Sequence, residues 1–282
     1  MSFFQYVEVK GEGPPLLCLH GHPGSSYAMS VFTHPLSQQF RTITPDLRGY
    51  GKSRTRSPFT MTDHLDDLDQ VLEKYQVNQC MILGWSLGGI LAMEMALRWP
   101  DRITGLILIG TAAHPRSSHP PISWQDNLYT GVAALINWAK PAWPWNIETF
   151  GKRSLLRYLF YHHNDAGYQR LATEGITAYL QASKYATQAL YGAMRQRYNR
   201  VEDIKQIHCP CLVLAGESDR HITAEASEET AKALPNAAYK CYTDVAHLFP
   251  WEIEDDMMTD IQNWLLHQTS IDKTGDDLSH LH

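Results

Sequence analysis

The 282-residue sequence lacks several features that would assign it to a specialised class of protein. It has no run of about 18 or more apolar residues, which is the length that a membrane-spanning helix needs. It has no excess of positive charge, because the formal net charge is -6 and the isoelectric point is about 6.1. This balance argues against a nucleic-acid-binding protein. Hydrophobic residues make up 44% and charged residues 19%, as in an ordinary globular enzyme.

The amino terminus does not show the pattern of a secretory signal, in which a positively charged stretch precedes an apolar one. The cysteines do not show the spacing of a disulfide framework. The first ten residues, MSFFQYVEVK, alternate as a β-strand does. The five cysteines stand in apolar, strand-like runs, where cysteine behaves as a small buried hydrophobe; they are Cys18, Cys80, Cys209, Cys211 and Cys241. We therefore expect free, buried thiols and a cytoplasmic location.

Patterns that bind metals or cofactors are sparse. His20 and His22 stand two apart at the end of a strand-like run, where both could face one metal ion. No HExxH motif or carboxylate–histidine cluster accompanies them, and Cys209-Pro-Cys211 lacks the two-residue gap of a zinc site. We expect neither a metal nor a cofactor.

Short apolar runs alternate with helical patterns over most of the chain. Helix candidates include 60–75, Ile90–Trp99, Ala224–Leu234 and about Asp255–His267. The strand candidates are Phe4–Val9, Leu16–His20, Thr42–Pro45, Cys80–Gly84, Thr104–Ile109, Cys211–Ala215 and Tyr239–Tyr242. Alternation of this kind, with nearly continuous apolar strands, predicts an α/β fold with a mostly parallel central sheet and helices on both faces.

The alternation stops between residues 113 and 200, which divides the chain. This stretch holds four of the eight tryptophans and ten Lys/Arg against four Asp/Glu, so its formal charge is +6 (10 − 4) and that of the rest is −12 (−6 − 6). We interpret 1–112 and 201–267 as one core and 113–200 as an inserted helical segment over the carboxyl ends of the strands. We expect its tryptophans to pack within it, with lipid contact by Lys140–Asn146 as the alternative. The polar stretch 268–282 is expected to be disordered.

The stretch Gly84-Trp85-Ser86-Leu87-Gly88-Gly89 carries the strongest chemical signal. An apolar strand ends there and an apolar helix follows at once, so the turn between them must be tight. Such a turn strains its central residue and requires tiny residues two positions before and after it, which Gly84 and Gly88 supply. The turn exposes Ser86 Oγ beside a helix amino terminus, where a nucleophile would stand.

A serine nucleophile needs a base and an acid that orients the base. His247 follows a strand and precedes the last helix, and Asp219 lies in the turn after the strand Cys211–Ala215. The chain order Ser86, Asp219, His247 suits strand-end loops of one sheet. Glu217 and Asp244 are rival acids.

These pieces together resemble the α/β-hydrolase superfamily from about Phe4 to His267. The matching motifs are HGHPGS at 20–25, DLRGYGKS at 46–53, GWSLGG at 84–89, GESD at 216–219 and AH at 246–247. The resemblance implies that 113–200 is a cap domain on a hydrolase core. It also implies that the backbone N–H groups of His22 and Leu87 form the oxyanion hole. A proline at 23 and a glycine at 21 suit a stiff loop close to Ser86, and we expect a cis bond between His22 and Pro23.

The reaction that this pattern predicts is acyl transfer from a small, largely apolar ester through an acyl-enzyme on Ser86. Family dehalogenases and epoxide hydrolases carry an aspartate where this chain has Ser86. Family proline iminopeptidases typically read GGSWG at the turn that holds the serine, and family C–C hydrolases typically have an extra glycine in the loop that corresponds to HGHPGS. This sequence matches neither pattern. A lactonase and a cofactor-free haloperoxidase or perhydrolase remain as alternatives. A non-catalytic binding or receptor member of the fold is the alternative of another class. We expect a small-molecule partner, no nucleic acid and no transmembrane segment.

Overall fold

The computed structural model describes residues 5–276, with side chains up to Gln268. Its centre is a seven-stranded sheet in the order β1-β3-β2-β4-β5-β6-β7. The strands are β1 (Val7–Lys10), β2 (Pro15–Leu19), β3 (Arg41–Pro45), β4 (Cys80–Trp85), β5 (Ile103–Ile109), β6 (Cys211–Gly216) and β7 (Ala237–Tyr242). All pairs are parallel except β1 with β3, so β1 is an antiparallel edge strand. The predicted α/β-hydrolase fold class is confirmed.

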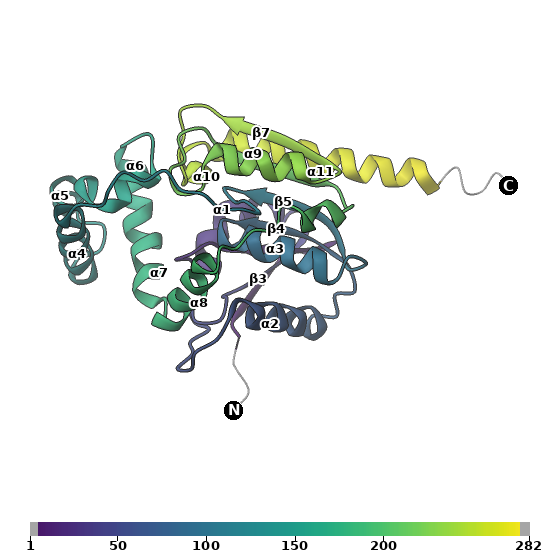
Figure 1. Cartoon of the computed structure of the whole chain (residues 1–282), viewed down its shortest axis with the longest axis horizontal. Coiled ribbons are helices and arrows are strands. Elements are labelled where there is room, and N and C mark those ends of the chain that lie inside the picture. Colours follow the sequence, from purple (N-terminus) through teal and green to yellow (C-terminus); the bar gives the residue numbers. More distant parts are fainter. Residues whose placement is uncertain (1–4, 277–282) are drawn as a thin grey trace.

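Helices cover both faces of this sheet (Figure 1). Alternate residues of β2 point to opposite sides, so Leu17 and Leu19 join one hydrophobic cluster while Leu16 and Cys18 join another. The first cluster packs against α2 (Met61–Lys74) and α3 (Leu87–Arg98), and α9 (Ala224–Ala233) packs on β6 and β7. The second packs against α1 (Ser30–Leu36), α10 (Phe249–Glu252) and α11 (Glu254–Asp276).

Between β5 and β6 the described chain is helical. The helices are α4 (Trp124–Ala139), α5 (Pro144–Thr149), α6 (Asp165–Arg170), α7 (Ile176–Gln181) and α8 (Lys184–Arg195), with 3-10 turns that include η3 (Leu155–Leu159). Helices α4 to α7 stand to one side of the sheet, at the left of Figure 1. The sequence predicted a helical segment here because the stretch offers no convincing strand and its later part, Leu155–Tyr198, has helical patterns.

Three expectations are wrong in detail. The last helix, α11, continues through Asp276, so residues 268–276 are helical rather than disordered, while 277–282 lie outside the described residues. Cys241 is exposed, although all five cysteines are free as expected. The tryptophans of the helical segment do not all pack inside it, because Trp124 and Trp138 are each 73% exposed.

No helix in the described part of the chain is long and apolar enough to cross a membrane.

Candidate active site

The turn between β4 and α3 has the predicted strained geometry. Ser86 stands at φ 53° and ψ −115°, in a left-handed region that non-glycine residues rarely adopt. Its N–H donates to the carbonyl of Ile109 at 2.9 Å, and its carbonyl accepts the hydroxyl of Thr111 at 2.8 Å. A Cβ at Gly88 would overlap the carbonyl of Leu19, and one at Gly84 would overlap the carbonyl of Gly88. The close contact between strand and helix therefore requires both glycines.

Asp219 and His247 come together from the loops after β6 and β7. His247 Nδ1 lies 2.7 Å from Asp219 Oδ2, and both residues are buried. The other carboxylate oxygen, Oδ1, accepts the N–H groups of His221 at 2.7 Å and Ile222 at 2.9 Å. Three hydrogen bonds thus fix the carboxylate, which in turn fixes the imidazole of His247.

The rival acids lie elsewhere. Glu217 is exposed, and its N–H donates to the carbonyl of Tyr242 at 2.8 Å. Asp244 is exposed at a left-handed φ of 56°. The structure therefore brings Asp219, and neither rival carboxylate, into hydrogen-bond contact with His247.

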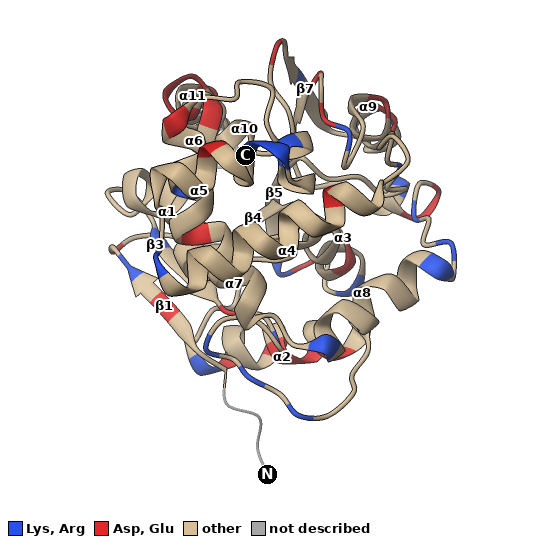
Figure 2. Cartoon of the chain, turned by 90° about the vertical axis from the view of Figure 1, so that its left-hand side faces the viewer, with Lys and Arg blue, Asp and Glu red and all other residues tan. Residues whose placement is uncertain are grey.

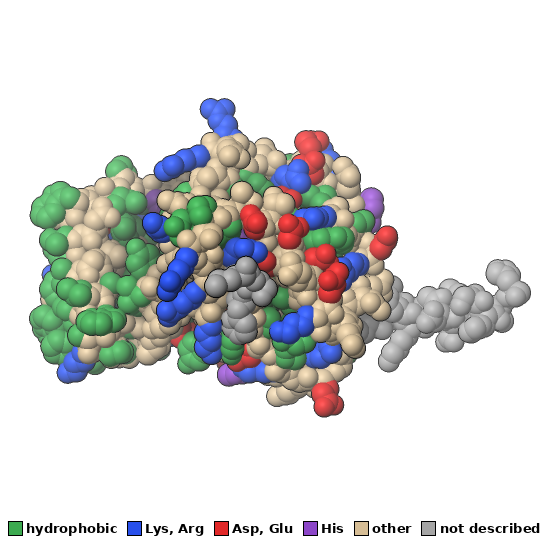
Figure 3. All heavy atoms as spheres, turned by 90° about the horizontal axis from the view of Figure 1, so that it is seen from below, with side chains coloured by type: hydrophobic (Ala, Val, Ile, Leu, Met, Phe, Trp, Pro, Cys, Tyr) green, Lys and Arg blue, Asp and Glu red, His purple; other side chains and the backbone are tan. Residues whose placement is uncertain are grey.

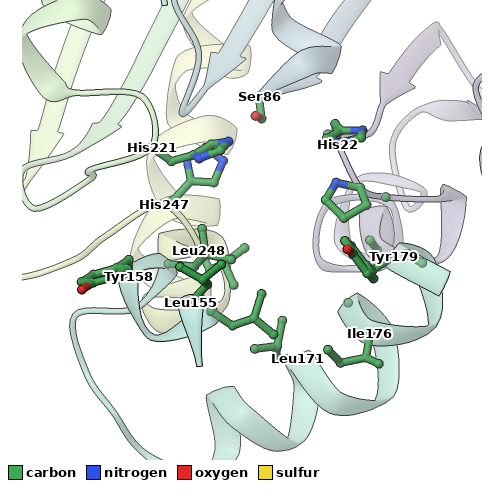
Figure 4. A pocket seen from close by; sticks show the side chains of 18 of the residues that line it. His22, Ser86, Leu155, Tyr158, Leu171, Ile176, Tyr179, His221, His247 and Leu248 are labelled. Atoms are coloured by element: carbon green, nitrogen blue, oxygen red, sulfur yellow. The ribbon is translucent and has the colours of Figure 1, made fainter. Parts of the chain in front are cut away.

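Ser86 and His247 line one cavity of about 350 Å³ (Figure 4). The hydrolase core contributes the loop Gly21–Gly24, and the helical segment contributes α4, η3, α7 and α8. Most of the lining is apolar, and no Lys, Arg, Asp or Glu side chain is part of it; the helical segment supplies Leu155, Leu156, Leu159, Leu171 and Ile176. Such a cavity suits a neutral, largely apolar molecule.

The loop HGHPGS runs beside the serine. A Cβ at Gly21 would lie 3.1 Å from the Cβ of Ser86, so the glycine permits the close approach. The bond between His22 and Pro23 is cis, as predicted. The Asp46 carboxylate holds the loop, because its Oδ1 accepts the N–H of Ser26 at 2.6 Å. Leu87 is the first residue of α3, where a helix leaves its N–H groups without partners of its own.

The two histidines of this loop have separate environments. Nε2 of the fully buried His20 accepts the N–H of Leu47 at 3.0 Å, so its Nδ1 carries the proton and donates to the carbonyl of Gly21 at 2.8 Å. His20 is therefore a structural end of β2. His22 Nδ1 instead lies 2.7 Å from the hydroxyl of Tyr50. The described residues hold no cluster of three or more His, Cys, Asp or Glu side chains suited to a metal ion.

Sequence reasoning missed two histidines that share the cavity with His247. The ring centroid of His221 lies 4.7 Å from that of His247, and His119 Nε2 lies 3.3 Å from His221 Nδ1. Burial, with a smaller contribution from the neighbouring His247, lowers the pKa of His221 to about 3, so its ring stays neutral. The position of His221 two residues after Asp219 was the available signal.

Comparisons with known proteins agree with this fold. The model of the α/β hydrolase fold family matches residues 14–252. The chain therefore belongs to the α/β-hydrolase fold family.

Individual relatives carry the names of several hydrolases. Among solved structures, a thermophilic esterase from Thermogutta terrifontis is 26% identical with a TM-score of 0.74, and the match covers 93% of each chain. A human epoxide hydrolase 4 is 27% identical over 93% of this chain and 74% of its own length. A pimeloyl-[acyl-carrier protein] methyl ester esterase of Nitrosospira multiformis is 39% identical, but the match covers only 38% of this chain and 41% of that protein.

Proposed function

We propose that this protein is a serine hydrolase that cleaves carboxylic esters. The observation that carries the proposal is the pair formed by Asp219 and His247, in hydrogen-bond contact at 2.7 Å, with His247 and the strained Ser86 lining the same cavity. The named esterase relatives support ester cleavage. The relative named epoxide hydrolase 4 points to another reaction, but a serine rather than a carboxylate at position 86 favours acyl transfer.

The reaction proceeds through an acyl-enzyme. Ser86 Oγ attacks the ester carbonyl carbon as its proton passes to Nε2 of His247. The carbonyl oxygen becomes an oxyanion, which the N–H groups of His22 and Leu87 stabilise. His247 returns the proton to the leaving alcohol. Water, deprotonated by His247, then attacks the acyl carbon and releases the acid and the free Ser86 hydroxyl. Asp219 keeps Nδ1 protonated and oriented throughout.

Residues 113–200 act as a cap that selects the substrate. Their side chains supply much of the apolar wall of the cavity, so the preferred ester is small, neutral and largely apolar. A lactone offers the same carbonyl in a ring, and hydrogen peroxide in place of water would give perhydrolysis. Neither requires a metal or a cofactor. The cytoplasmic location stays a prediction.

The test is a labelling experiment with a fluorophosphonate probe and a panel of esters and lactones of graded acyl length. Wild-type protein should be labelled and should turn over short to medium esters. Ser86→Ala should abolish labelling and lower kcat by at least about a thousandfold. If the wild-type protein is not labelled and turns over no ester or lactone between about pH 6 and 9, it is a binding or receptor protein of this fold.

We also propose that the cap rests on a phospholipid surface. Trp124, Leu128, Leu135 and Trp138 are all exposed, and their spacing places them on one face of α4. The one Asp, Glu, Lys or Arg residue of α4, Asp126, is buried and paired with Arg157 at 2.8 Å. Figure 2 looks onto this side, where few charged residues are visible over α4, α5 and α7. Figure 3 shows hydrophobic side chains gathered over the same end.

The charge of the cap favours a lipid surface over a second copy of the chain. Its formal charge of +6 (10 − 4) attracts anionic headgroups. In a two-fold dimer the same face would meet itself and bring two positive segments together. Lys140 follows α4 directly, with its ammonium 4.3 Å from the ring centroid of Trp143, so a cation stands beside the aromatic side chains. This pairing suits the boundary between headgroups and acyl chains.

A further inference from the structure

The imidazole of His22 has no part in the mechanism above, where only its backbone N–H is used. It stands across the cavity from His247 and His221, with Ser86 between the two sides (Figure 4). Two tyrosine rings hold it edge to face: Tyr50 at 5.6 Å and Tyr191 at 6.2 Å between centroids. A polar ring with a fixed orientation, in a cavity with a mostly apolar wall, is suited to recognise part of a ligand.

The position of the proton on this ring follows from Tyr50. That side chain is fully buried, and the hydroxyl has no hydrogen-bond partner among the described residues other than His22 Nδ1, at 2.7 Å. Burial raises the pKa of Tyr50, so the hydroxyl keeps its hydrogen. A buried O–H with a single acceptor in reach donates to that acceptor. The Tyr50 hydroxyl therefore donates to Nδ1, and Nδ1 carries no proton.

The opposite nitrogen then carries the single proton of a neutral ring. Burial, with a smaller contribution from His20, lowers the pKa of His22 to about 4, so the ring is neutral near pH 7. In a neutral imidazole with Nδ1 as acceptor, Nε2–H is the donor. Nε2 has no partner among the described residues. It points away from Tyr50, which does not line the cavity, while His22 does line it.

We propose that Nε2–H of His22 binds a neutral oxygen acceptor of the substrate, such as an ether, ketone, amide or second ester oxygen close to the scissile carbonyl. His22 is then a specificity-determining residue, and Tyr50 is a positioning residue that fixes its tautomer. This inference rests on the proposed ester hydrolysis. A neutral donor suits a neutral acceptor, and the absence of Lys, Arg, Asp and Glu from the lining of the cavity agrees with that class of ligand.

The kinetic test uses p-nitrophenyl hexanoate and analogues in which an ether oxygen replaces one chain methylene at successive positions. Each kcat/KM is divided by the rate of hydroxide-catalysed hydrolysis of the same ester, which removes differences in intrinsic reactivity. For at least one position, the ratio of oxa-ester to alkyl ester should be about 3- to 10-fold higher in the wild type than in His22→Phe, the gain from one neutral hydrogen bond. Tyr191→Phe, which removes the hydroxyl of the other tyrosine whose ring packs against His22, is the matched control and should keep the wild-type ratio.

A tautomer measurement separates the positioning role of Tyr50 from a purely structural one. Long-range ¹H–¹⁵N spectra of the wild type should show His22 with a protonated Nε2 and a bare Nδ1. Tyr50→Phe keeps the ring but removes the proton donor. The spectra of this variant should therefore show a mixture of the two His22 tautomers, and its oxa-ester ratio should fall towards that of His22→Phe. Circular dichroism should show that Tyr50→Phe is folded.

The outcomes distinguish this inference from the proposed function. A protonated Nδ1 in the wild type overturns the inference, and so does an equal oxa-ester ratio in wild type and His22→Phe at every position. A ratio lost equally in Tyr191→Phe would assign the donor to Tyr191 and overturn it too. Absence of Ser86-dependent turnover of every ester would instead overturn the proposed function, while the spectra would still report the tautomer.

Discussion

Asp219 accepts three hydrogen bonds, from His247 and from the N–H groups of His221 and Ile222. These bonds fix its carboxylate in the position that orients His247. Replacing Asp219 with Asn keeps the shape but lets the amide donate to Nδ1, which selects the wrong tautomer of His247. We predict that Asp219→Asn lowers kcat by about 10³- to 10⁴-fold for the best ester. Glu217→Gln and Asp244→Asn are matched controls and should stay within about threefold of the wild type. A loss at Asp244→Asn as large as that at Asp219→Asn would move the acid to that residue.

The sequence could predict Ser86, Asp219 and His247 because each follows an apolar strand, and strand ends meet at one edge of a parallel sheet. It could not predict His119 as their neighbour. His119 lies in the loop before α4, and only the path of that loop brings it to His221. The partner of His22 is likewise invisible in sequence, since Tyr50 comes from a loop beyond β3.

The turn between β4 and α3 offers a direct test of how strand and helix position the serine. A Cβ at Gly88 would overlap the carbonyl of Leu19, and this carbonyl belongs to the backbone of β2, so it cannot move aside cheaply. We predict that Gly88→Ala lowers the free energy of unfolding by about 2–4 kcal/mol and abolishes activity, measured by urea denaturation and ester turnover.

Gly192 in α8 is the matched control, because a Cβ there would meet nothing within 4 Å. Gly192→Ala should raise the free energy of unfolding by up to about 1 kcal/mol, since alanine favours the helix. A Gly88→Ala protein as stable and active as the wild type would show that the turn tolerates a side chain there.

Helix and strand positions differed in how well sequence could predict them. All seven strands appear within a few residues of their expected bounds, because apolar runs bounded by glycine and proline leave little freedom. The exposed face of α4 was not predicted, because the polar residues Asp126 and Asn137 lie on its buried side and large apolar residues lie on its exposed side, the reverse of the usual amphipathic pattern. The polar composition after His267 likewise hid the extension of α11 to Asp276.

At the level of the whole molecule, buried histidines make stability depend on pH. Burial lowers the pKa of His64 to about 3, with smaller contributions from His20 and Arg48. The unfolded chain, with a histidine pKa of about 6.5, therefore takes up the proton first as pH falls. The stabilisation is complete above about pH 6.5 and is lost progressively between about pH 6.5 and 3.

His64→Leu removes this titration. We predict that between pH 6 and 4 the unfolding free energy of the variant falls less steeply than that of the wild type, by up to about 1.4 kcal/mol per pH unit. The measurement is urea denaturation at a series of pH values. His162→Leu, at an exposed position, is the control and should follow the wild-type slope. Equal slopes for wild type and His64→Leu would show that His64 is protonated in the folded protein.

The exposed face of α4 leads to a prediction about binding of the intact protein to lipid. Burying Trp124 and Trp138 in the headgroup region removes large apolar areas from water, and the positive cap adds attraction to anionic lipid. Wild-type protein should sediment with phosphatidylcholine vesicles, and more strongly when phosphatidylglycerol is added. The double variant Trp124→Gln/Trp138→Gln should bind at least about tenfold more weakly.

The control Tyr27→Gln/Tyr161→Gln alters two exposed aromatic residues outside α4 and should bind as the wild type does. Equal vesicle binding by both double variants would contradict the prediction. Loss of a wild-type dimer in the tryptophan variant, with no vesicle binding by the wild type, would instead assign the face to a second copy of the chain.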